Sequence, residues 1–157
     1  MEFDFFPNEL EPETGIFFYT ENLTFELNNT LKIKDWLSKI IEQEGQTLSL
    51  LNFIFCDDEF LHQINVNYLN HDTLTDIITF PLAELPKIAG EIYISIPRVQ
   101  ENAVTFDTTF ENELHRVLAH GVLHLCGYLD KSDEEAQLMR RKEEAALQLF
   151  SDSEMNI

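Results

Sequence analysis

The run LSLLNFIFC, residues 48–56, decides the fold class of this chain. It is apolar at almost every position, whereas a strand with one face in water alternates apolar and polar residues. A run of this length and composition predicts a central β-strand covered on both faces. The segments on either side of it show the patterns of the helices and further strands that such a sheet needs.

These flanking patterns predict one mixed architecture along the whole chain. The expected elements, in chain order, are one or two strands at 16–19 and 23–27, a helix at 31–44, the strand at 48–56, a helix at 57–69, strands at 75–80 and 90–96, a helix or irregular turn after Pro97, and helices at about 109–126 and 132–150. We therefore expect a single compact α+β domain over residues 1–157, with a small mixed β-sheet packed against about five helices. Its acidic N-terminal stretch, about 1–15, and its polar tail, about 151–157, are the expected flexible ends.

Two of the predicted helices carry recognisable signals for their first turn. Asp57 or Asp58 is the expected N-cap of the helix at 57–69, and Ser132 with Glu135 has the spacing of a capping box for the last helix. The helical spacing in 57–69 places four residues on the buried side of that helix: Phe60, Leu61, Ile64 and Tyr68.

Composition and charge exclude several classes of protein. With 44% hydrophobic and 25% charged residues, the chain falls in the range of ordinary globular proteins rather than disordered ones. Its net charge of −19 argues against a protein that binds nucleic acid through a broad basic face, although seven of the 29 acidic residues lie within the first 30. No apolar run is long enough for a membrane span, and the acidic start does not resemble a secretory signal, so we expect a cytoplasmic protein. The two cysteines, Cys56 and Cys126, have apolar neighbours and are expected to be core thiols.

The strongest chemical signal is a histidine pair in HGVLHLCGYLD, residues 120–130. On an α-helix, the four-residue spacing of His120 and His124 puts both imidazoles on one face, about one turn apart, where both can bind one ion. Such a pair also occurs on helices that bind no metal, so its context matters. His115 lies about 140 degrees around the same helix from His120 and is expected at the surface or behind the ligands.

Gly127 offers a route to a third metal ligand. A glycine just after a helix commonly takes a positive φ and turns the chain back over the last helical turn. Asp130 then comes within reach of the two histidines, and its carboxylate suits zinc, with manganese or iron as alternatives. Three protein ligands and one open position are the usual arrangement of a catalytic zinc ion.

Gly121, inside the same helix, restricts the chemistry that this site can perform. Zinc peptidases of the HExxH type place their glutamate general base at this position, so a standard peptidase is disfavoured. A glycine in a helix interior costs about 1 kcal/mol relative to alanine. Either the close approach of a substrate or another backbone beside the metal, or tight packing of the helix, would explain that cost.

Three segments of the chain resemble the YbeY family of metal-dependent endoribonucleases. The stretch HGVLHLCGYLD resembles the family pattern H-G-x-L-H-L-x-G-Y-D-H, INVNYLNHDTLTDIITFPL at 64–82 resembles N-x-x-Y-R-x-x-D-x-x-T-D-V-L-S-F-P, and GEIYISI at 90–96 resembles G-D-I-x-I-S. Together these segments span roughly residues 50–145. The histidine pattern is the specific part of the resemblance.

The resemblance implies a small α+β fold with one zinc ion per chain, or another divalent transition metal in its place. It also implies cleavage of single-stranded RNA, in small-subunit rRNA 3′ end maturation and in ribosome quality control. Carried over by position, the first two zinc ligands are His120 and His124, and the third histidine of the pattern falls on Asp130. Thr75 and Asp76 match the Thr-Asp pair of the family, where Asp76 either lies near the metal-activated water or closes the turn before the strand.

Two positions depart from the family pattern. Asp130 in place of histidine adds a negative charge, which should make a metal-bound water less acidic and shift the metal preference. The arginine after the tyrosine of the pattern, a candidate phosphate contact, falls on Leu69. His71, Arg98 or Arg116 would have to take over that contact, although an exposed or supporting role explains each of them equally well.

Our leading hypothesis is a metal-dependent endoribonuclease that meets single-stranded rRNA within ribosomal particles, beside ribosomal proteins. The net charge of −19 favours such an encounter over long-range capture of free RNA. Two alternatives remain open: a non-catalytic ribosome assembly factor that its metal stabilises, which the loss of the arginine at Leu69 favours, and a metallohydrolase that acts on another substrate.

Overall fold

The apolar run at residues 48–56 lies in the middle of a four-stranded sheet. The computed structural model describes residues 14–69 and 75–155, in which the run belongs to β2 (Thr47–Cys56). Strands β1 (Gly15–Glu21) and β4 (Lys87–Ser95) pair with β2 in parallel on its two sides, and β3 (Ile77–Pro81) pairs antiparallel with β4. The order β1-β2-β4-β3 makes the sheet mixed, with β2 inside it, as the sequence predicts.

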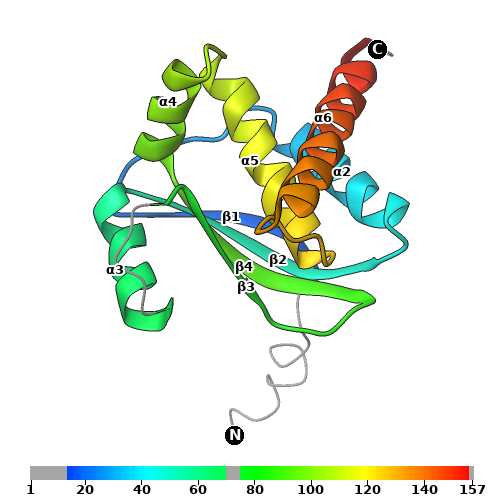
Figure 1. Ribbon diagram of the computed structural model, residues 1–157, viewed down its shortest axis with the longest axis horizontal. Coiled ribbons are helices and arrows are strands. Elements are labelled where there is room, and N and C mark those ends of the chain that lie inside the picture. The colour runs from blue at the N-terminus through cyan, green and yellow to red at the C-terminus, as the bar shows by residue number, and fades with distance from the viewer. Residues whose placement is uncertain (1–13, 70–74, 156–157) are drawn as a thin grey trace, which may run out of the picture.

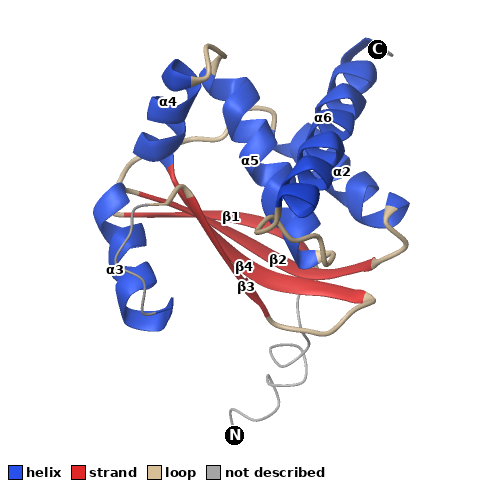
Figure 2. Cartoon of the chain, viewed as in Figure 1, coloured by secondary structure: helices blue, strands red, loops and turns tan. Residues whose placement is uncertain are grey.

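In the part of the chain that the structure describes, five helices complete a compact α+β domain, which confirms the expected fold class. Helices α2, α5 and α6 cover one face of the sheet, α3 packs against the other face at the β3 side, and α4 connects the end of β4 to α5 (Figure 1, Figure 2). Their bounds are α2 Thr30–Gln43, α3 Asp58–Leu69, α4 Ile96–Thr105, α5 Phe110–Leu125 and α6 Asp133–Met155. Since both faces of the central strand carry apolar residues, helices on both sides are the arrangement that buries them.

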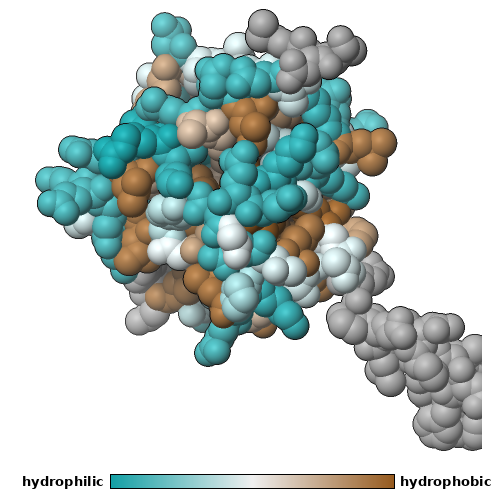
Figure 3. Space-filling view, turned by 90° about the vertical axis from the view of Figure 1, so that its right-hand side faces the viewer, coloured by the Kyte–Doolittle hydropathy of each residue, from teal (hydrophilic) through white to brown (hydrophobic). Residues whose placement is uncertain are grey.

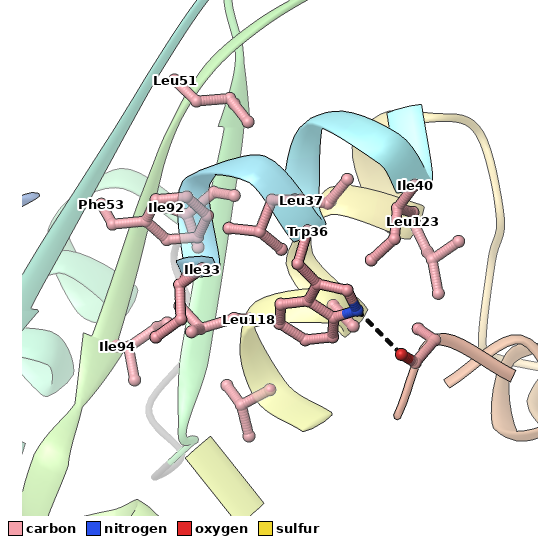
Figure 4. Close-up of a cluster of buried hydrophobic side chains, with 14 of the residues drawn as sticks. Ile33, Trp36, Leu37, Ile40, Leu51, Phe53, Ile92, Ile94, Leu118 and Leu123 are labelled. Atoms are coloured by element: carbon pink, nitrogen blue, oxygen red, sulfur yellow. Dashed lines mark hydrogen bonds between the residues drawn. The ribbon is translucent and has the colours of Figure 1, made fainter. Parts of the chain in front are cut away.

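The main core lies between the sheet and the three helices above it (Figure 4). Alternate residues of β4, Ile92 and Ile94, point toward this core and are completely buried, as is Leu118 of α5. Trp36 of α2 donates a hydrogen bond of 2.8 Å from Nε1 to the backbone carbonyl of Ala146 in α6. The indole therefore contributes buried apolar area and also joins two helices, with its polar atom satisfied.

Gly121 is explained by the packing of α5 on the sheet. A Cβ atom at this position would lie 3.0 Å from Cδ1 of Ile77 and 3.1 Å from Cδ1 and Cγ2 of Ile92. Those contacts are tighter than ordinary side-chain packing, and Ile92 is fully buried. Of the two explanations that the sequence left open, tight helix packing is therefore the one that the contacts support.

Three details differ from the sequence-based expectations. Residues 23–27 form no strand; their apolar residues pack on the core instead, with Phe25 stacked edge-on against Phe55 and Phe110. Helix α6 continues to Met155, past its expected end at residue 150, since the polar side chains of its last turns bond locally, as Gln148 does to Asp152.

The expected flexible ends lie partly outside the described residues, at 1–13 and 156–157.

The third difference concerns α3, whose buried side is narrower than the pattern suggests. Asp57 caps this helix by accepting a hydrogen bond from the backbone N–H of Phe60 at 2.8 Å, and Leu61 and Ile64 are buried as expected. Tyr68, by contrast, is 73% exposed. Its ring lies edge-on to Phe80 of the edge strand β3 and is otherwise open, so periodicity alone overestimates how much of the helix is covered.

The capping box of the last helix is confirmed in both directions. The backbone N–H of Glu135 donates to the Ser132 hydroxyl at 3.1 Å, and the N–H of Ser132 donates to the Glu135 carboxylate at 2.9 Å. Seen from the right-hand side of Figure 1, hydrophilic side chains cover much of the surface, with apolar side chains in patches between them (Figure 3). Among the described helices, none is long and apolar enough to cross a membrane.

Candidate metal centre

A cleft of about 550 Å³ brings together most of the residues that the sequence singled out. Its walls come from the end of α3, the start of β3, one side of α5 and the loop between α5 and α6. His120, His124 and Asp130 line it on one side, and Thr75 and Asp76 line it from the segment that leads into β3. The helix that carries the histidines and the loop that carries Asp130 therefore meet at one site.

Each of the two histidines has one ring nitrogen committed to an acceptor. Nδ1 of His120 donates to Oε2 of Glu143 at 2.6 Å, and Nδ1 of His124 donates to the backbone carbonyl of Tyr128 at 2.8 Å. The two rings lie nearly parallel, 17 degrees apart, with centroids separated by 6.1 Å. This leaves Nε2 of both rings as the nitrogen that can bind a ligand in the cleft.

Gly127 places the third candidate ligand as the sequence predicts. It has a φ of 110 degrees, its N–H donates to the carbonyl of His124 at 3.0 Å, and the N–H of Tyr128 donates to the carbonyl of Leu123 at 3.1 Å. These two bonds form the Schellman motif that ends a helix. The chain then returns over the helix, and Oδ2 of Asp130 lies 3.4 Å from Nε2 of His120.

A second set of contacts holds this loop in place. The Tyr128 hydroxyl donates to Oε1 of Glu44 at 2.6 Å, and Lys142 donates to Oε2 of the same carboxylate at 2.9 Å. The Lys142 ammonium also lies 5.1 Å from the centre of the Tyr128 ring. The loop with Asp130 is thus tied to α2 and α6 as well as to α5.

The donor set fits a metal ion in its chemistry. Within residues 14–69 and 75–155, no group of three His, Cys, Asp or Glu side chains has the arrangement of a metal site as it stands. Metal-binding histidines, however, usually donate their second ring N–H to a carboxylate or a backbone carbonyl, and both His120 and His124 do so here. Two oriented imidazoles and an adjacent carboxylate are ligands that suit zinc.

Behind His120 lies a buried chain of charged side chains. The Glu143 carboxylate, 3% exposed, accepts from His120 at Oε2 and from Nη1 of Arg116 at Oε1, 2.9 Å away. Arg116 also donates from Nε to Oε1 of Glu113 at 3.0 Å and forms a second bond to the other oxygen of Glu113, which is 1% exposed. Two buried carboxylates and one partly exposed guanidinium thereby satisfy one another, as buried charges require.

The pKa values of these groups follow from burial and from their partners. Burial lowers the pKa of His120, but the hydrogen bond and charge of Glu143, together with the charges of Asp130 and Asp76, raise it more. Burial raises the pKa of Glu143, yet its bonds to His120 and Arg116 outweigh burial and lower it. Glu143 therefore remains an anion and a strong acceptor for the imidazole.

Asp76 shows the opposite behaviour in the same cleft. Burial raises the pKa of its carboxyl above the usual range, and the charges of Arg116 and His120 oppose this only in part. Oδ2 accepts from Nδ2 of Asn102 at 3.4 Å, while the backbone carbonyl of Asp76 accepts from the N–H of Ser95 at 3.0 Å. The neighbouring Thr75 hydroxyl donates to the carbonyl of Ile77 at 3.3 Å, and both Thr75 and Asp76 line the cleft.

Of the three candidate phosphate contacts named from the sequence, one lines the cleft, one lies away from it and one is outside the described residues. Arg98 does not line this cleft, because its guanidinium is held by Asp58 at 2.6 Å and by Glu101 at 3.4 Å. Arg116 lines the cleft, but it is paired with two glutamates rather than solvated on a helix face. His71 lies outside the described residues.

Leu69 forms part of the cleft wall, and Lys131 also lines the cleft. His115 is buried, with its ring centroid 4.4 Å from that of Phe150, and not at the surface or behind the ligands as expected. Sequence reasoning also missed Glu143. A signal for it exists: Glu143 falls in the apolar stripe of α6 that contains Met139, Ala146 and Phe150, all of them buried.

Comparison with known proteins places this geometry in a family. The family model described as "Endoribonuclease YbeY" matches residues 18–151 of the chain. This chain belongs to the endoribonuclease YbeY family. A protein named endoribonuclease YbeY from Flavobacterium johnsoniae is 54% identical over 126 residues, which are 80% of this chain and 91% of that protein. One from Christiangramia forsetii is 52% identical over 133 residues, 85% of this chain and 92% of that protein.

A solved structure supports the same conclusion about the fold. The solution structure of TM1509 from Thermotoga maritima matches 90% of this chain and 92% of its own, with a TM-score of 0.62 and 29% sequence identity. The resemblance to the YbeY family drawn from three short motifs is therefore confirmed. In this member of the YbeY family, the histidine pattern, the Thr-Asp pair and the position of Leu69 all meet in one cleft.

Proposed function

We propose that this protein is a metal-dependent endoribonuclease that cuts single-stranded RNA at the cleft. The observation that carries the proposal is the pair of histidines whose Nδ1 atoms donate to Glu143 and to the carbonyl of Tyr128, which orients both Nε2 atoms for a ligand. His120, His124 and Asp130 are the proposed ligands of one zinc ion or another divalent transition metal. Membership of the endoribonuclease YbeY family supports RNA as the substrate.

When bound, such an ion activates water for attack and stabilises charge on the phosphoryl oxygens. The residues around it have separate tasks. Glu143 orients the His120 ring, and Arg116 keeps Glu143 ionised. Asp76, a carboxyl whose pKa burial has raised, is proposed to accept a proton at its carboxylate oxygen in the cleft. No glutamate follows His120, so the proton acceptor must come from elsewhere, and Asp76 faces the same space.

Phosphate binding is assigned to Lys131. Of the two cations that line the described cleft, Arg116 is already paired with two carboxylates, whereas no ion pair within the described chain involves the Lys131 ammonium. Lys131 follows Asp130 directly, so a phosphate beside the metal ligands would lie near it. We propose Lys131 as the group that takes the place of the arginine that falls on Leu69.

The cellular setting is proposed from the family resemblance and the charge. A chain with a net charge of −19 repels free polyanions, so we infer that it meets rRNA inside ribosomal particles in the cytoplasm, next to basic ribosomal proteins. Small-subunit rRNA 3′ end maturation and ribosome quality control are the proposed roles there.

The test is cleavage of a labelled single-stranded RNA by the zinc-loaded protein, beside a duplex of the same sequence. We expect the single strand alone to be cut, and the His124→Ala variant, purified identically, to be inactive. Equal cleavage by both proteins would mean that the activity belongs to a contaminant. The alternative hypothesis is a non-catalytic assembly factor, which the leucine at position 69 favours. It requires that the wild-type protein does not cut RNA and that removal of the metal unfolds it.

A further inference from the structure

A second hollow of about 530 Å³ lies on the α3 side of the sheet, and nothing in the proposed reaction uses it. It is formed between α3 and the end of the β3–β4 pair. We call it the aromatic groove, since four of its lining residues are aromatic: Phe60, Tyr68, Phe80 and Tyr93. Its size lies within the range of small-ligand sites in proteins.

Tyr68 is the exposed ring of the aromatic groove, whereas its other three rings are partly buried. Phe80 is edge-on to both Tyr93 and Tyr68, with centroids 5.8 Å and 6.4 Å apart and interplanar angles of 88 and 83 degrees. Tyr68 is 73% exposed, and Leu82 at the rim is 60% exposed. A tyrosine ring this exposed at the edge of a hollow buries little apolar area within the fold, but it offers a π-face to a partner.

Polar groups stand at the edge of the aromatic groove. Gln63 and Asn67 of α3 provide amides, and Glu91 of β4 provides a carboxylate that accepts from the Tyr93 hydroxyl at 3.1 Å. No lysine or arginine is among the described residues that line it. The aromatic groove therefore suits an uncharged ring with hydrogen-bonding edges and does not suit a phosphate group.

The aromatic groove and the proposed catalytic cleft share their walls. Helix α3 contributes Leu69 to the cleft and the adjacent Tyr68 to the aromatic groove, and β3 contributes Thr79 to the cleft and the adjacent Phe80 to the aromatic groove. Successive residues of each element thus line one hollow and then the other. Since neighbouring residues of a strand point to opposite faces of the sheet, the edge strand β3 stands between the two hollows, and a polymer held in the cleft reaches the aromatic groove by passing around that edge.

We propose that the aromatic groove binds an unpaired nucleobase of the RNA whose backbone lies in the cleft. The base stacks on Tyr68, and its edge bonds to the amides and to Glu91. Aromatic side chains that stack unpaired bases are the common way in which proteins hold single strands, and carboxylates accept from amino groups of bases. Since a paired base cannot leave its duplex without cost, this contact would also favour single strands over duplexes. The inference rests on the proposed function.

A fluorescent reporter tests binding separately from cleavage. Trp36, the single tryptophan of the chain, is buried, so a Tyr68→Trp substitution adds an exposed indole in the aromatic groove. In a His124→Ala background, which cannot cut, we expect a single-stranded oligoribonucleotide to quench this indole saturably, and its duplex to quench much less. The matched control is Tyr19→Trp in the same background. Tyr19 is also an exposed tyrosine, 50% accessible, but it lies on β1 at the opposite edge of the sheet.

The kinetic test uses the full metal-loaded protein. Tyr68→Ala should raise KM for single-stranded RNA about five-fold or more, because the loss of one stacked base costs at least about 1 kcal/mol of binding free energy. Its kcat should be nearly unchanged. Tyr68→Phe, which keeps the ring, should restore the wild-type KM, and Tyr19→Ala should leave it unchanged. An unaltered KM in Tyr68→Ala, or quenching equal at positions 68 and 19, would overturn the proposal.

Two further outcomes are informative. If sedimentation shows a dimer that Tyr68→Ala dissociates while RNA affinity is unchanged, the aromatic groove is an interface between copies of this chain and the proposal is wrong. If the wild-type protein does not cut RNA but the Tyr68→Trp reporter is quenched by single strands alone, the base site stands and the proposed catalytic function fails.

Discussion

Glu143 accepts the Nδ1 hydrogen of His120 and a hydrogen bond from Arg116, so one buried carboxylate supports the proposed metal ligand. Glu143→Gln keeps the size of the side chain but removes its charge. We expect the affinity for zinc to fall about 10- to 100-fold, as substitutions behind metal-binding histidines usually do. Competition with a chromophoric chelator measures this affinity. The adjacent exposed Glu144 offers a matched control, Glu144→Gln, and equal affinities in the two variants would contradict the role of Glu143.

Lys131 is the cation of the cleft that forms no ion pair with a carboxylate of the described chain. Lys131→Gln should raise KM for single-stranded RNA several-fold. It should also make log KM less dependent on log salt by about 0.7, the contribution of one phosphate contact to a single strand. Steady-state cleavage at several salt concentrations gives both numbers. Lys39→Gln is the control, because Lys39 pairs with Asp35 at 3.2 Å on α2, and an effect of the same size there would indicate a general loss of charge.

His115 makes the stability of the protein depend on pH. Burial lowers the pKa of its imidazole between Trp36 and Phe150, so the folded state prefers the neutral ring. The unfolded chain, with a pKa near 6.5, then binds more protons than the folded chain. This contribution is complete above about pH 6.5 and is lost as the pH falls through the lower pKa of the folded state.

The corresponding measurement is urea unfolding of the wild type and of His115→Gln, each at two values of pH above and below this window. The wild type should lose more free energy of unfolding than the variant on going to the lower pH. Parallel losses in both proteins would mean that other groups cause the pH dependence.

At the scale of elements, the packing of α5 on the sheet depends on the missing side chain at Gly121. Gly121→Ala gains up to about 1 kcal/mol of helix propensity. Overpacking against Ile77 and the fully buried Ile92 costs about 1–3 kcal/mol. We therefore expect a net destabilisation of about 1 kcal/mol in chemical denaturation. A stabilised variant would show instead that the two isoleucines can move aside.

The turn after α5 shows how one element serves two purposes. Gly127 ends the helix, and the same turn presents the Tyr128 carbonyl to His124 and returns Asp130 to His120. The sequence predicts this turn, because a glycine at the end of a helix is a local signal. It does not predict the hydrogen bond from the Tyr128 hydroxyl to Glu44, since that bond joins residues 84 positions apart.

At the scale of the whole molecule, the proposed metal site lies beside the core and not within it. The large core cluster between α2, α5, α6 and the sheet contains none of the three proposed ligands. Chelation should therefore abolish RNA cleavage but leave the far-ultraviolet circular dichroism nearly unchanged. The melting temperature should fall modestly, because a metal present at about 100 times its Kd adds about 2.7 kcal/mol.

The His124→Ala variant serves as the control for this measurement, because its melting temperature should not respond to the chelator. Loss of helical signal on chelation of the wild type would contradict the expectation and favour the structural role of the metal that an assembly factor requires.

The sequence by itself determined most of the architecture. The central strand, the helices around it, the caps at Asp57 and Ser132, the turn at Gly127 and the histidine pair all follow from periodicity or from a few adjacent residues. These features are encoded locally, because backbone conformation and amphipathic spacing depend on near neighbours in the chain.

Only the tertiary structure decided which charges meet and which aromatic rings remain open. Glu143 lies behind His120 although 23 residues separate them, and Arg116 is paired rather than free because α5 and α6 pack together. Tyr68 follows the apolar spacing of α3 yet is exposed, because the last turn of that helix lies beside the edge strand β3 and no further element covers it among the described residues. Burial and pairing depend on the contacts between elements, and a periodic pattern specifies which face of an element is apolar but not what lies against it.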